Sequence, residues 1–493
     1  MPPVRGRWLA LLAALLGWMF DGMEMGLFPL VARDALAEIL GNVSKNHPDV
    51  DRWFSIVMAA FLIGAATGGV VFGWLGDKIG RVRAMSVSVL LYSLSSGLSA
   101  LSETPGQLAG LRFLGALGMG GEWALGVALV MEVWADKSRA WLAGLIGAFG
   151  NLGYTLCGLV ALGLMSNGSL VSETIAKIGV DPHTVDTLTR NGFWRLLMLM
   201  GATPALLTFV IRIFVPESEH WTKEKSAGRA SFWSTPDLLG VLVGAAAAIG
   251  VVRLWLEKEM NPAVRVPLTL LGLLIVTLGY MYPAIRYFQR SGLPSPQRKK
   301  ALNRMLLAAG LSGVALLGTW SAVMWMYQWV GKLPGGTEAT ARPMTQIYSS
   351  LGAALGCIIG ASLCLKYSRR LVYAAMCFGS MISIVGFYQL NDAYGYQFLL
   401  TAAFMSVMSA SFYGWLPLYL PELFPTAVRA TGQGFGFNFG RILAAVGNLL
   451  MPSLLAAFDN NYAHACAVVP VVYLVGLMLI GIAPETKGKP LPE

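Results

Sequence analysis

Long apolar stretches, separated by short polar breaks, follow one another along the whole chain. About 14 of them reach the roughly 20 apolar residues that a helix needs to cross a bilayer. They predict spans near residues 8–32, 53–75, 84–102, 107–132, 140–165, 193–215, 237–255, 264–286, 303–329, 344–365, 371–390, 396–420, 429–456 and 463–483. The pattern therefore indicates an all-α membrane protein with about 14 transmembrane helices.

The charged residues support this prediction by their number and position. Of the 493 residues, 56% are hydrophobic and 13% are charged, about half of the ~25% typical of soluble domains. So few charges cannot cover a soluble surface, which excludes a soluble enzyme. The net charge of +10 comes from Lys and Arg in the breaks between spans. Their distribution follows the positive-inside rule, which favours a cell-membrane protein with both termini in the cytoplasm and no nucleic-acid partner.

The sequence shows no ligand set for a metal ion. The five cysteines lie in or near apolar stretches, and the four histidines lie in predicted loops. None of them has the spacing of a metal site. We expect no metal and no bound cofactor.

Two parts of the chain repeat each other at an offset of 290 residues. Glu132 and Arg139 are followed by Gly144 and Phe149-Gly150, and Glu422 and Arg429 by Gly434 and Phe439-Gly440. A weaker pair joins Pro216-Glu217-Ser218 to Pro484-Glu485-Thr486. The repeat predicts two six-helix halves, 1–221 and 301–493. Between them lies a cytoplasmic linker, 222–300, which carries two extra transmembrane helices in 237–286.

The segment after the second predicted span reads Gly73-Trp-Leu-Gly76-Asp77-Lys78-Ile-Gly80-Arg81. It resembles the signature between the second and third helices of the major facilitator superfamily. Arg112-Phe-Leu-Gly115, Pro216-Glu217-Ser218 and Pro484-Glu485-Thr486 resemble the sugar-porter and organic-acid branches. Asp21-Gly22-Met23-Glu24 and Gly440-Arg441 are similar to motifs of aromatic-acid:proton symporters, and Gly121-Glu122 to one of sialate and metabolite:proton symporters. The resemblance implies the major facilitator fold and alternating access around a cavity between the halves.

Four charged residues in the first and fourth spans are candidates for proton coupling: Asp21, Glu24, Glu122 and Arg112. A carboxylate at the bilayer centre costs at least ~2.5–3.5 kcal/mol, so each acid needs a partner or a proton. Asp21 and Glu24 share a helix face because they lie three residues apart. Either they carry protons, or they form structural ion pairs with Arg112 or Arg441. The same choice applies to Glu122, which could instead fix the first helix against the fourth.

A second set of residues is expected to meet the substrate. Arg441, in the eleventh span, could bind a substrate carboxylate through its two parallel N–H groups; alternatively it joins the halves by an ion pair. Aromatic and amide side chains suit a ring or a sugar, although the aromatic ones could face lipid instead. These candidates are Trp320, Trp325, Gln328, Asn151, Tyr154, Tyr413 and Trp415.

A third set lies in the predicted cytoplasmic breaks: Asp77, Arg81, Glu132, Arg139, Glu422 and Arg429. We expect these charges to gate the transporter by holding the halves together in the outward-open state. The alternative is ordinary helix capping and orientation of the spans.

Together these features predict a secondary active transporter that is not an enzyme. The preferred hypothesis is proton-coupled symport of a small organic acid or a sugar-like metabolite, driven by the proton gradient. A uniporter or exporter with structural acids is the first alternative, and a non-transporting membrane sensor is the second. Its partners would be the small-molecule substrate and the lipid bilayer, and we expect a monomer.

Overall fold

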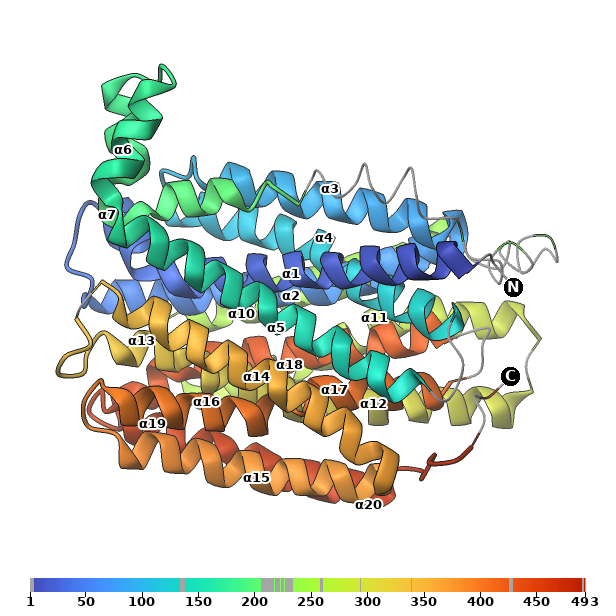
Figure 1. The fold of residues 1–493 in the computed structure, drawn as a ribbon. Helices are drawn as coiled ribbons and strands as arrows, with labels where there is room; N and C mark the ends of the chain where they lie inside the picture. Colours follow the sequence, from blue (N-terminus) through green and yellow to red (C-terminus); the bar gives the residue numbers. More distant parts are fainter. Residues whose placement is uncertain are drawn as a thin grey trace.

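The structure, a computed structural model, describes residues 4–133, 138–204, 217, 222, 226, 234–257, 260–292, 294–337, 339–424, 429–489 and 492. Every regular element in these ranges is a helix (Figure 1). The first group of helices is α1 (Val4–Ile39), α2 (Pro48–Ile79), α3 (Arg81–Ser99), α4 (Pro105–Val133), α5 (Arg139–Ser166), α6 (Gly168–Lys177) and α7 (Pro182–Met200).

A helix pair and a second group follow along the chain. A short helix, η3 (Thr235–Asp237), leads into the pair α10 (Leu238–Leu256) and α11 (Pro262–Arg290). The second group is α12 (Ser295–Ser321), η4 (Val323–Trp325), α13 (Met326–Val330), α14 (Ala341–Lys366), α15 (Arg369–Leu390), α16 (Tyr396–Ala410), α17 (Phe412–Glu422), α18 (Arg429–Ala457), α19 (Tyr462–Val468), η6 (Val469–Val471) and α20 (Val472–Ile482).

Eleven helical segments of the described chain are long and apolar enough to cross a bilayer. They include each predicted span except the third, fourth and sixth. α3 and α4 occupy the positions of the third and fourth, packed on each other and on α2. The sixth predicted span, 193–215, lies only partly within the described residues. The expected all-α architecture is thus confirmed, and the count of 14 is approximate.

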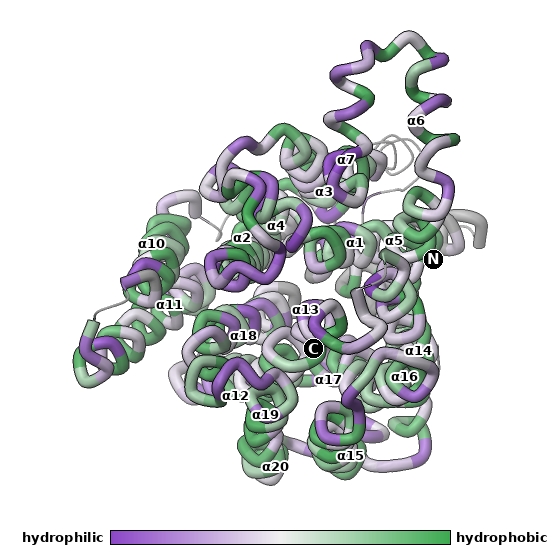
Figure 2. Tube along the Cα trace, turned by 90° about the vertical axis from the view of Figure 1, so that its left-hand side faces the viewer, coloured by the Kyte–Doolittle hydropathy of each residue, from purple (hydrophilic) through white to green (hydrophobic). Residues whose placement is uncertain are grey.

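The long helices run roughly parallel to one another, and both chain termini lie at one end of the bundle (Figure 1). We call this the terminal end, and the other the distal end. Viewed along the bundle, α1–α7 and α12–α20 form two groups, which meet where α2 packs on α18 and where α5 packs on α14 (Figure 2). Large apolar side chains point outward from both groups, such as Leu98 and Phe378, each more than half exposed. Such a surface suits contact with lipid.

The sixth predicted span begins with a feature that periodicity did not indicate. The backbone of α7 leaves the helical conformation at Arg190–Phe193, where Asn191, Gly192 and Phe193 have positive φ angles. The part of α7 before this kink pairs with α6 and projects sideways from the distal end of the bundle (Figure 1). α6 buries none of its residues. A kinked helix hairpin therefore precedes the membrane-spanning part of the segment.

The extra helix pair lies against one of the two contacts between the groups. α10 and α11 both pack on α2 and on α18 (Figure 2). The Tyr280 hydroxyl on α11 lies 2.6 Å from the Thr67 hydroxyl on α2, and both are buried. At the terminal end, Arg290 donates two 2.6 Å hydrogen bonds to the Asp237 carboxylate. The pair is thus anchored to the bundle instead of standing apart from it.

The repeated Pro-Glu motifs have the same local role in both groups. The Glu217 carboxylate accepts hydrogen bonds from the backbone N–H groups of Arg81 and Val82, at 2.8 and 3.2 Å. Glu485 accepts equivalent bonds from Arg369 and Arg370, at 3.1 and 3.3 Å. Each glutamate therefore caps the N-terminus of a helix, α3 or α15, where unpaired N–H groups and the helix dipole favour a negative charge.

Candidate functional site: a cavity between the two helix groups

A cavity of about 130 Å³ lies inside the bundle, between the two helix groups. Its wall is formed by side chains of α1, α4 and α5 on one side and of α12, η4, α13, α14, α16, α17 and α18 on the other. The ring-bearing residues of the wall are Trp18, Trp123, Tyr154, Trp320, Tyr327, Tyr413 and Phe437. Two charged residues, Asp21 and Arg441, also line it.

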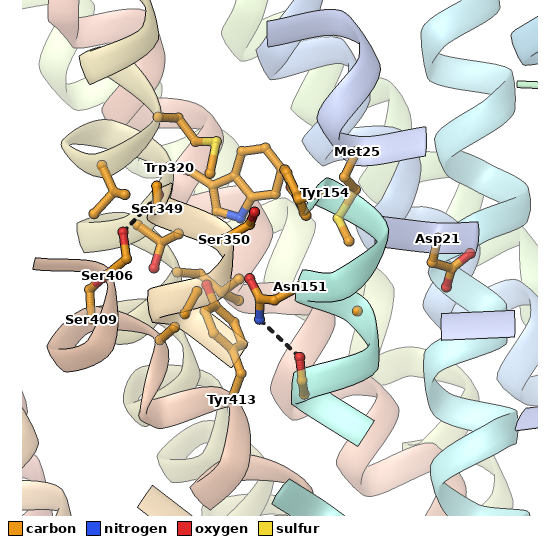
Figure 3. Close-up of a pocket in the computed structure, with 18 of the residues that line it drawn as sticks. Asp21, Met25, Asn151, Tyr154, Trp320, Ser349, Ser350, Ser406, Ser409 and Tyr413 are labelled. Atoms are coloured by element: carbon orange, nitrogen blue, oxygen red, sulfur yellow. Dashed lines mark hydrogen bonds between the residues drawn. The ribbon is translucent and has the colours of Figure 1, made fainter. Parts of the chain in front are cut away.

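Glycines place Asp21 at this wall by letting α1 approach α5 closely. A Cβ atom at Gly22 would lie 1.7 Å from the carbonyl oxygen of Gly150, and one at Gly153 would lie 1.9 Å from that of Met19. Neither position can therefore hold a side chain without moving a helix. This close contact, typical of glycines between membrane helices, fixes the rotation of α1 about its axis and so the place of Asp21 among the lining residues, where it lies apart from the other labelled side chains (Figure 3).

Glu24 lies behind this wall, and each of its two carboxylate oxygens has a hydrogen-bond partner. Its carboxylate forms an ion pair with Arg112 of α4 and accepts a hydrogen bond from Ser96 of α3. Arg112 also donates to the backbone carbonyl of Glu24 at 3.3 Å, and its guanidinium lies 4.9 Å from the centre of the Phe61 ring. Glu24 and Arg112 are at most 2% exposed. Glu24, Arg112 and Ser96 thus connect α1, α4 and α3, which all belong to the first group.

Asp21 has different neighbours, because its carboxyl group lies beside that of Glu122 and within electrostatic range of Arg441. Asp21 and Glu122 are 4% and 1% exposed. One carboxylate oxygen of Asp21 and both of Glu122 accept no hydrogen bond from an amide, hydroxyl or guanidinium group of the described residues. Two acids thus meet next to one cation, which comes from the other helix group.

Arg441 reaches the cavity from α18. Its guanidinium lies 5.2 Å from the centre of the Phe437 ring, and this ring stacks on Trp123 of α4 at 3.8 Å. Within the described chain, its Nη1 atom has no hydrogen-bond partner although the side chain is buried. An unsatisfied buried guanidinium N–H is costly, and a carboxylate in the cavity would satisfy it.

The opposite wall carries small polar groups that the sequence analysis did not single out. The hydroxyls of Ser349 and Ser406 lie 2.7 Å apart (Figure 3). The Ser350 hydroxyl lies 2.8 Å from that of Thr155 on α5, which does not itself line the cavity. Ser409 lines the cavity beside them. Serine is too common in membrane helices to mark a site by itself, and only the fold brings these residues from α14 and α16 to one surface.

The structure divides the predicted substrate-binding residues into two sets. Arg441, Trp320, Asn151, Tyr154 and Tyr413 line the cavity. Asn151 donates a 2.9 Å hydrogen bond to the carbonyl of Gly147 one turn earlier, which holds its amide along the wall (Figure 3).

Trp325, Gln328 and Trp415 are buried but do not line the cavity. Trp325 packs on Phe54 and donates to Asn448 at 3.1 Å. Trp415 donates to the carbonyl of Arg369 at 3.0 Å. The helix of the seventh span is interrupted at Ala322, and this break changes the direction of the residues that follow it. A continuous helix would place Gln328 on the face of Trp320.

Most of the predicted gating side chains, those of Asp77, Glu132, Arg139 and Arg429, lie outside the described residues. Glu422 is described, and it accepts hydrogen bonds from Arg369 at 2.9 and 3.2 Å and from Thr486 at 2.6 Å. All three residues belong to the second helix group, so these contacts do not cross between the groups. Arg81 lies at the start of α3, at the terminal end of the first group.

The sequence profile of the Major Facilitator Superfamily matches residues 8–447, most of the chain. The chain belongs to the major facilitator superfamily. A putative metabolite transport protein of Haemophilus influenzae is 24% identical over 98% of both chains. The putative niacin/nicotinamide transporter NiaP of Bacillus subtilis is 26% identical over 96% of this chain and 94% of that protein.

A solved structure of the proton:xylose symporter XylE has a TM-score of 0.67 to this chain. The two are 18% identical, and the alignment covers 99% of this chain and 98% of XylE. At this identity the likeness shows a shared fold. The protein is therefore a multi-pass membrane transporter of the major facilitator superfamily, and not an enzyme.

Proposed function

We propose that the protein is a proton-coupled symporter of a small organic acid that carries a ring. The observation that supports this most directly is that Asp21 and Arg441 line the cavity and that Glu122 lies beside Asp21, behind the cavity wall. This arrangement supplies a place for a proton and a place for a carboxylate within reach of each other. It also links the helix groups that must move, because the two acids come from one group and the arginine from the other.

The carboxyl pair is the proposed proton site. Two carboxylates side by side repel each other in a buried setting, and one proton shared between them removes the repulsion. Arg441 partly offsets the remaining negative charge through its attraction to Asp21. When a substrate carboxylate binds Arg441, it competes for this attraction. The acid pair then holds its proton more firmly, so substrate and proton are carried together.

The walls of the cavity suit an aromatic or similar flat ring. Trp320, Tyr154 and Tyr413 offer flat faces, and the serine hydroxyls opposite offer hydrogen bonds to a ring nitrogen or a substituent. The size of the cavity fits a molecule of one ring. Niacin/nicotinamide, named for the Bacillus subtilis relative, has this chemistry. An acid is favoured over a sugar because the buried guanidinium has an N–H group that needs an anion.

The alternative proton site is Glu24. In this alternative, protonation of Glu24 would break its ion pair with Arg112 and release the arginine. Asp21 is favoured because it lines the cavity and lies beside Glu122, whereas Glu24 is held behind the cavity wall by Ser96 and Arg112. Basic residues near the terminal end, among them Arg298, Lys299 and Lys300 at the start of α12, support a cytoplasmic position for this end.

The test is transport by the purified protein in liposomes, with radiolabelled nicotinate as the first substrate. An inward proton gradient should drive accumulation, and a proton-conducting ionophore should abolish it. Counterflow uptake, screened over aromatic acids, aliphatic acids and sugars, identifies the substrate class without any gradient. Counterflow without an effect of the proton gradient would contradict symport; counterflow of sugars alone would contradict the acid.

A further inference from the structure

The distal end carries a second cluster of charges, which the proposed function does not use. Asp34 near the end of α1 forms ion pairs with Lys45 and with Arg342 of α14, the latter at 3.2 Å. Asp51 at the start of α2 pairs with Arg33 at 2.6 Å and with Lys332 at 3.3 Å. Each aspartate thus contacts one cation of its own helix group and one of the other group.

Both contacts between the groups are sheltered from water. The exposed fractions of the side chains are 8% for Asp34 and 17% for Arg342, and 16% for Asp51 and 27% for Lys332. Tyr462, at the start of α19, adds a 3.2 Å hydrogen bond from its hydroxyl to Asp51. Partly buried pairs are screened less than exposed ones, so these contacts hold the two groups together at the distal end.

The charges are divided unequally between the groups. Arg33 and Lys45 belong to the first group, as both aspartates do. The charges of that group therefore still balance one another when the groups separate. In the described part of the chain, Lys332 and Arg342 form ion pairs only with Asp51 and Asp34. When the groups separate at this end, two positive charges on the second group lose their partners. An anion that arrives from the distal side can replace them.

A crevice borders one of the two ion pairs, Asp34–Arg342, and does not reach Asp51 or Lys332. It has a volume of about 330 Å³ and is lined by Asp34, Lys45, Asn46, Gly192 and Arg342, among others. Burial lowers the pKa of Lys332, although Asp51 opposes this shift. The cost of leaving these cations unpaired is therefore a cost of opening, and an anion in the crevice, which borders Arg342, reduces it there.

We propose that Asp34–Arg342 and Asp51–Lys332 form a distal latch, and that its opening creates an entry site for small anions at Lys332 and Arg342. The latch keeps the distal end closed until a carboxylate takes the place of the aspartates. The anion preference rests on the proposed function in one respect, since there the substrate is an organic acid. The latch itself requires neither proton coupling nor transport.

The first experiment measures access to the cavity from the distal side. Ser349→Cys places a thiol on the cavity wall, and the five native cysteines are buried. Its rate of reaction with membrane-impermeant methanethiosulfonates is measured in oriented vesicles, with the protein that retains Ser349 as the background. Asp34→Asn with Asp51→Asn should raise the rate roughly 2- to 10-fold, because both ion pairs between the groups are lost. An unchanged rate would overturn the latch.

The matched control is Glu38→Gln. Glu38 lies at the same end, is 6% exposed, and pairs with Arg190 at 2.9 Å and Arg195 at 3.2 Å. All three belong to the first group, so this variant removes ion pairs without touching the contact between the groups and should leave the rate unchanged. Asp34→Asn and Arg342→Gln, alone and combined, form a double-mutant cycle. Direct pairing predicts that their effects are not additive, and strict additivity would contradict the pair.

The second experiment uses the charge of the reagent as the probe. The anionic sulfonatoethyl methanethiosulfonate is compared with its cationic trimethylammonium counterpart at the same Ser349→Cys thiol. Lys332→Gln with Arg342→Gln should lower the ratio of anionic to cationic rates about tenfold, the low end of electrostatic steering. An unchanged ratio would overturn the entry site. Neither experiment needs a transported substrate, so a failed latch and a failed symporter are distinguishable.

Discussion

Asp21 and Glu24 lie one turn apart on α1, yet their carboxyl groups have opposite surroundings. Glu24 is held by Arg112, Ser96 and its own side of the bundle. Asp21 faces another acid, Glu122, and a cation from the other helix group. A buried acid with matched partners is a structural link, and one beside a second acid needs a proton. Two acids that lie one turn apart on the same helix, and that are equally costly to bury in a membrane, can therefore have different roles.

Removing the carboxyl pair should have the largest effect on function. Asp21→Asn takes away the shared proton site, so accumulation driven by a proton gradient should be lost while counterflow of the same substrate continues. Glu24→Gln serves as the contrast and should retain the gradient response in whatever protein remains folded. Gradient-driven uptake and counterflow are measured in the same liposomes. Full coupling in Asp21→Asn, with loss in Glu24→Gln, would reverse the comparison.

Removing the partner of Glu24 should have the largest effect on stability. Arg112→Leu leaves a buried carboxylate without its cation, which costs about 3–5 kcal/mol. Thermal unfolding in detergent should show a clear fall in melting temperature. The double variant Glu24→Leu with Arg112→Leu should recover much of the loss, because no buried charge remains. A double variant as unstable as the single one would show that the ion pair is not the reason.

Replacing the cation near Asp21 should weaken substrate binding. Arg441→Gln removes a charge-assisted hydrogen bond worth about 1.5–3 kcal/mol, so KM for nicotinate should rise roughly 10- to 100-fold. Nicotinamide, its neutral amide, provides the control, since its binding should change much less. Melting temperature is recorded beside KM. Equal losses for both compounds would place Arg441 outside the carboxylate site.

The smallest effect is expected from Ser96, the second partner of Glu24 beside Arg112. Ser96→Ala removes one hydrogen bond to the carboxylate and leaves the ion pair with Arg112 in place. The expected loss of stability is about 1–2 kcal/mol, seen as a modest fall in melting temperature with coupling retained. If this variant altered the proton dependence of uptake, Glu24 would belong to the proton site after all.

The sequence predicted the fold class because apolar stretches of fixed length leave few alternatives in a bilayer. Asp21 and Arg441 were found for a related reason, since charges at that depth are rare. The separate surroundings of Asp21 and Glu24 depend on which side chains of α3, α4 and α18 reach α1, and the spacing of residues along one helix does not contain this information. Gln328 was expected on the face of Trp320 because a continuous helix would place it there, and the break at Ala322 changes its direction. Trp325 was expected at the cavity because of its depth in the span, and it packs on Phe54 instead.

The serine wall and the distal charges escaped sequence analysis for a different reason. Ser349 and Ser406, like Asp51 and Lys332, are far apart along the chain and belong to no motif. The sequence does not mark any of these residues as functional, and only the folded structure brings them together. The motif residues at the terminal end were easier to find, because the repeat marks them twice.

The helix pair α10–α11 makes the two sides of the transporter unequal toward the bilayer. It lies over the junction of α2 and α18 and is fastened there by Tyr280. The junction of α5 and α14 has no such cover from this pair, and its apolar side chains, such as Leu159 and Leu355, face outward. Lipid therefore reaches the contact between the groups directly along α5 and α14, whereas α10 and α11 lie between the lipid and the contact of α2 with α18.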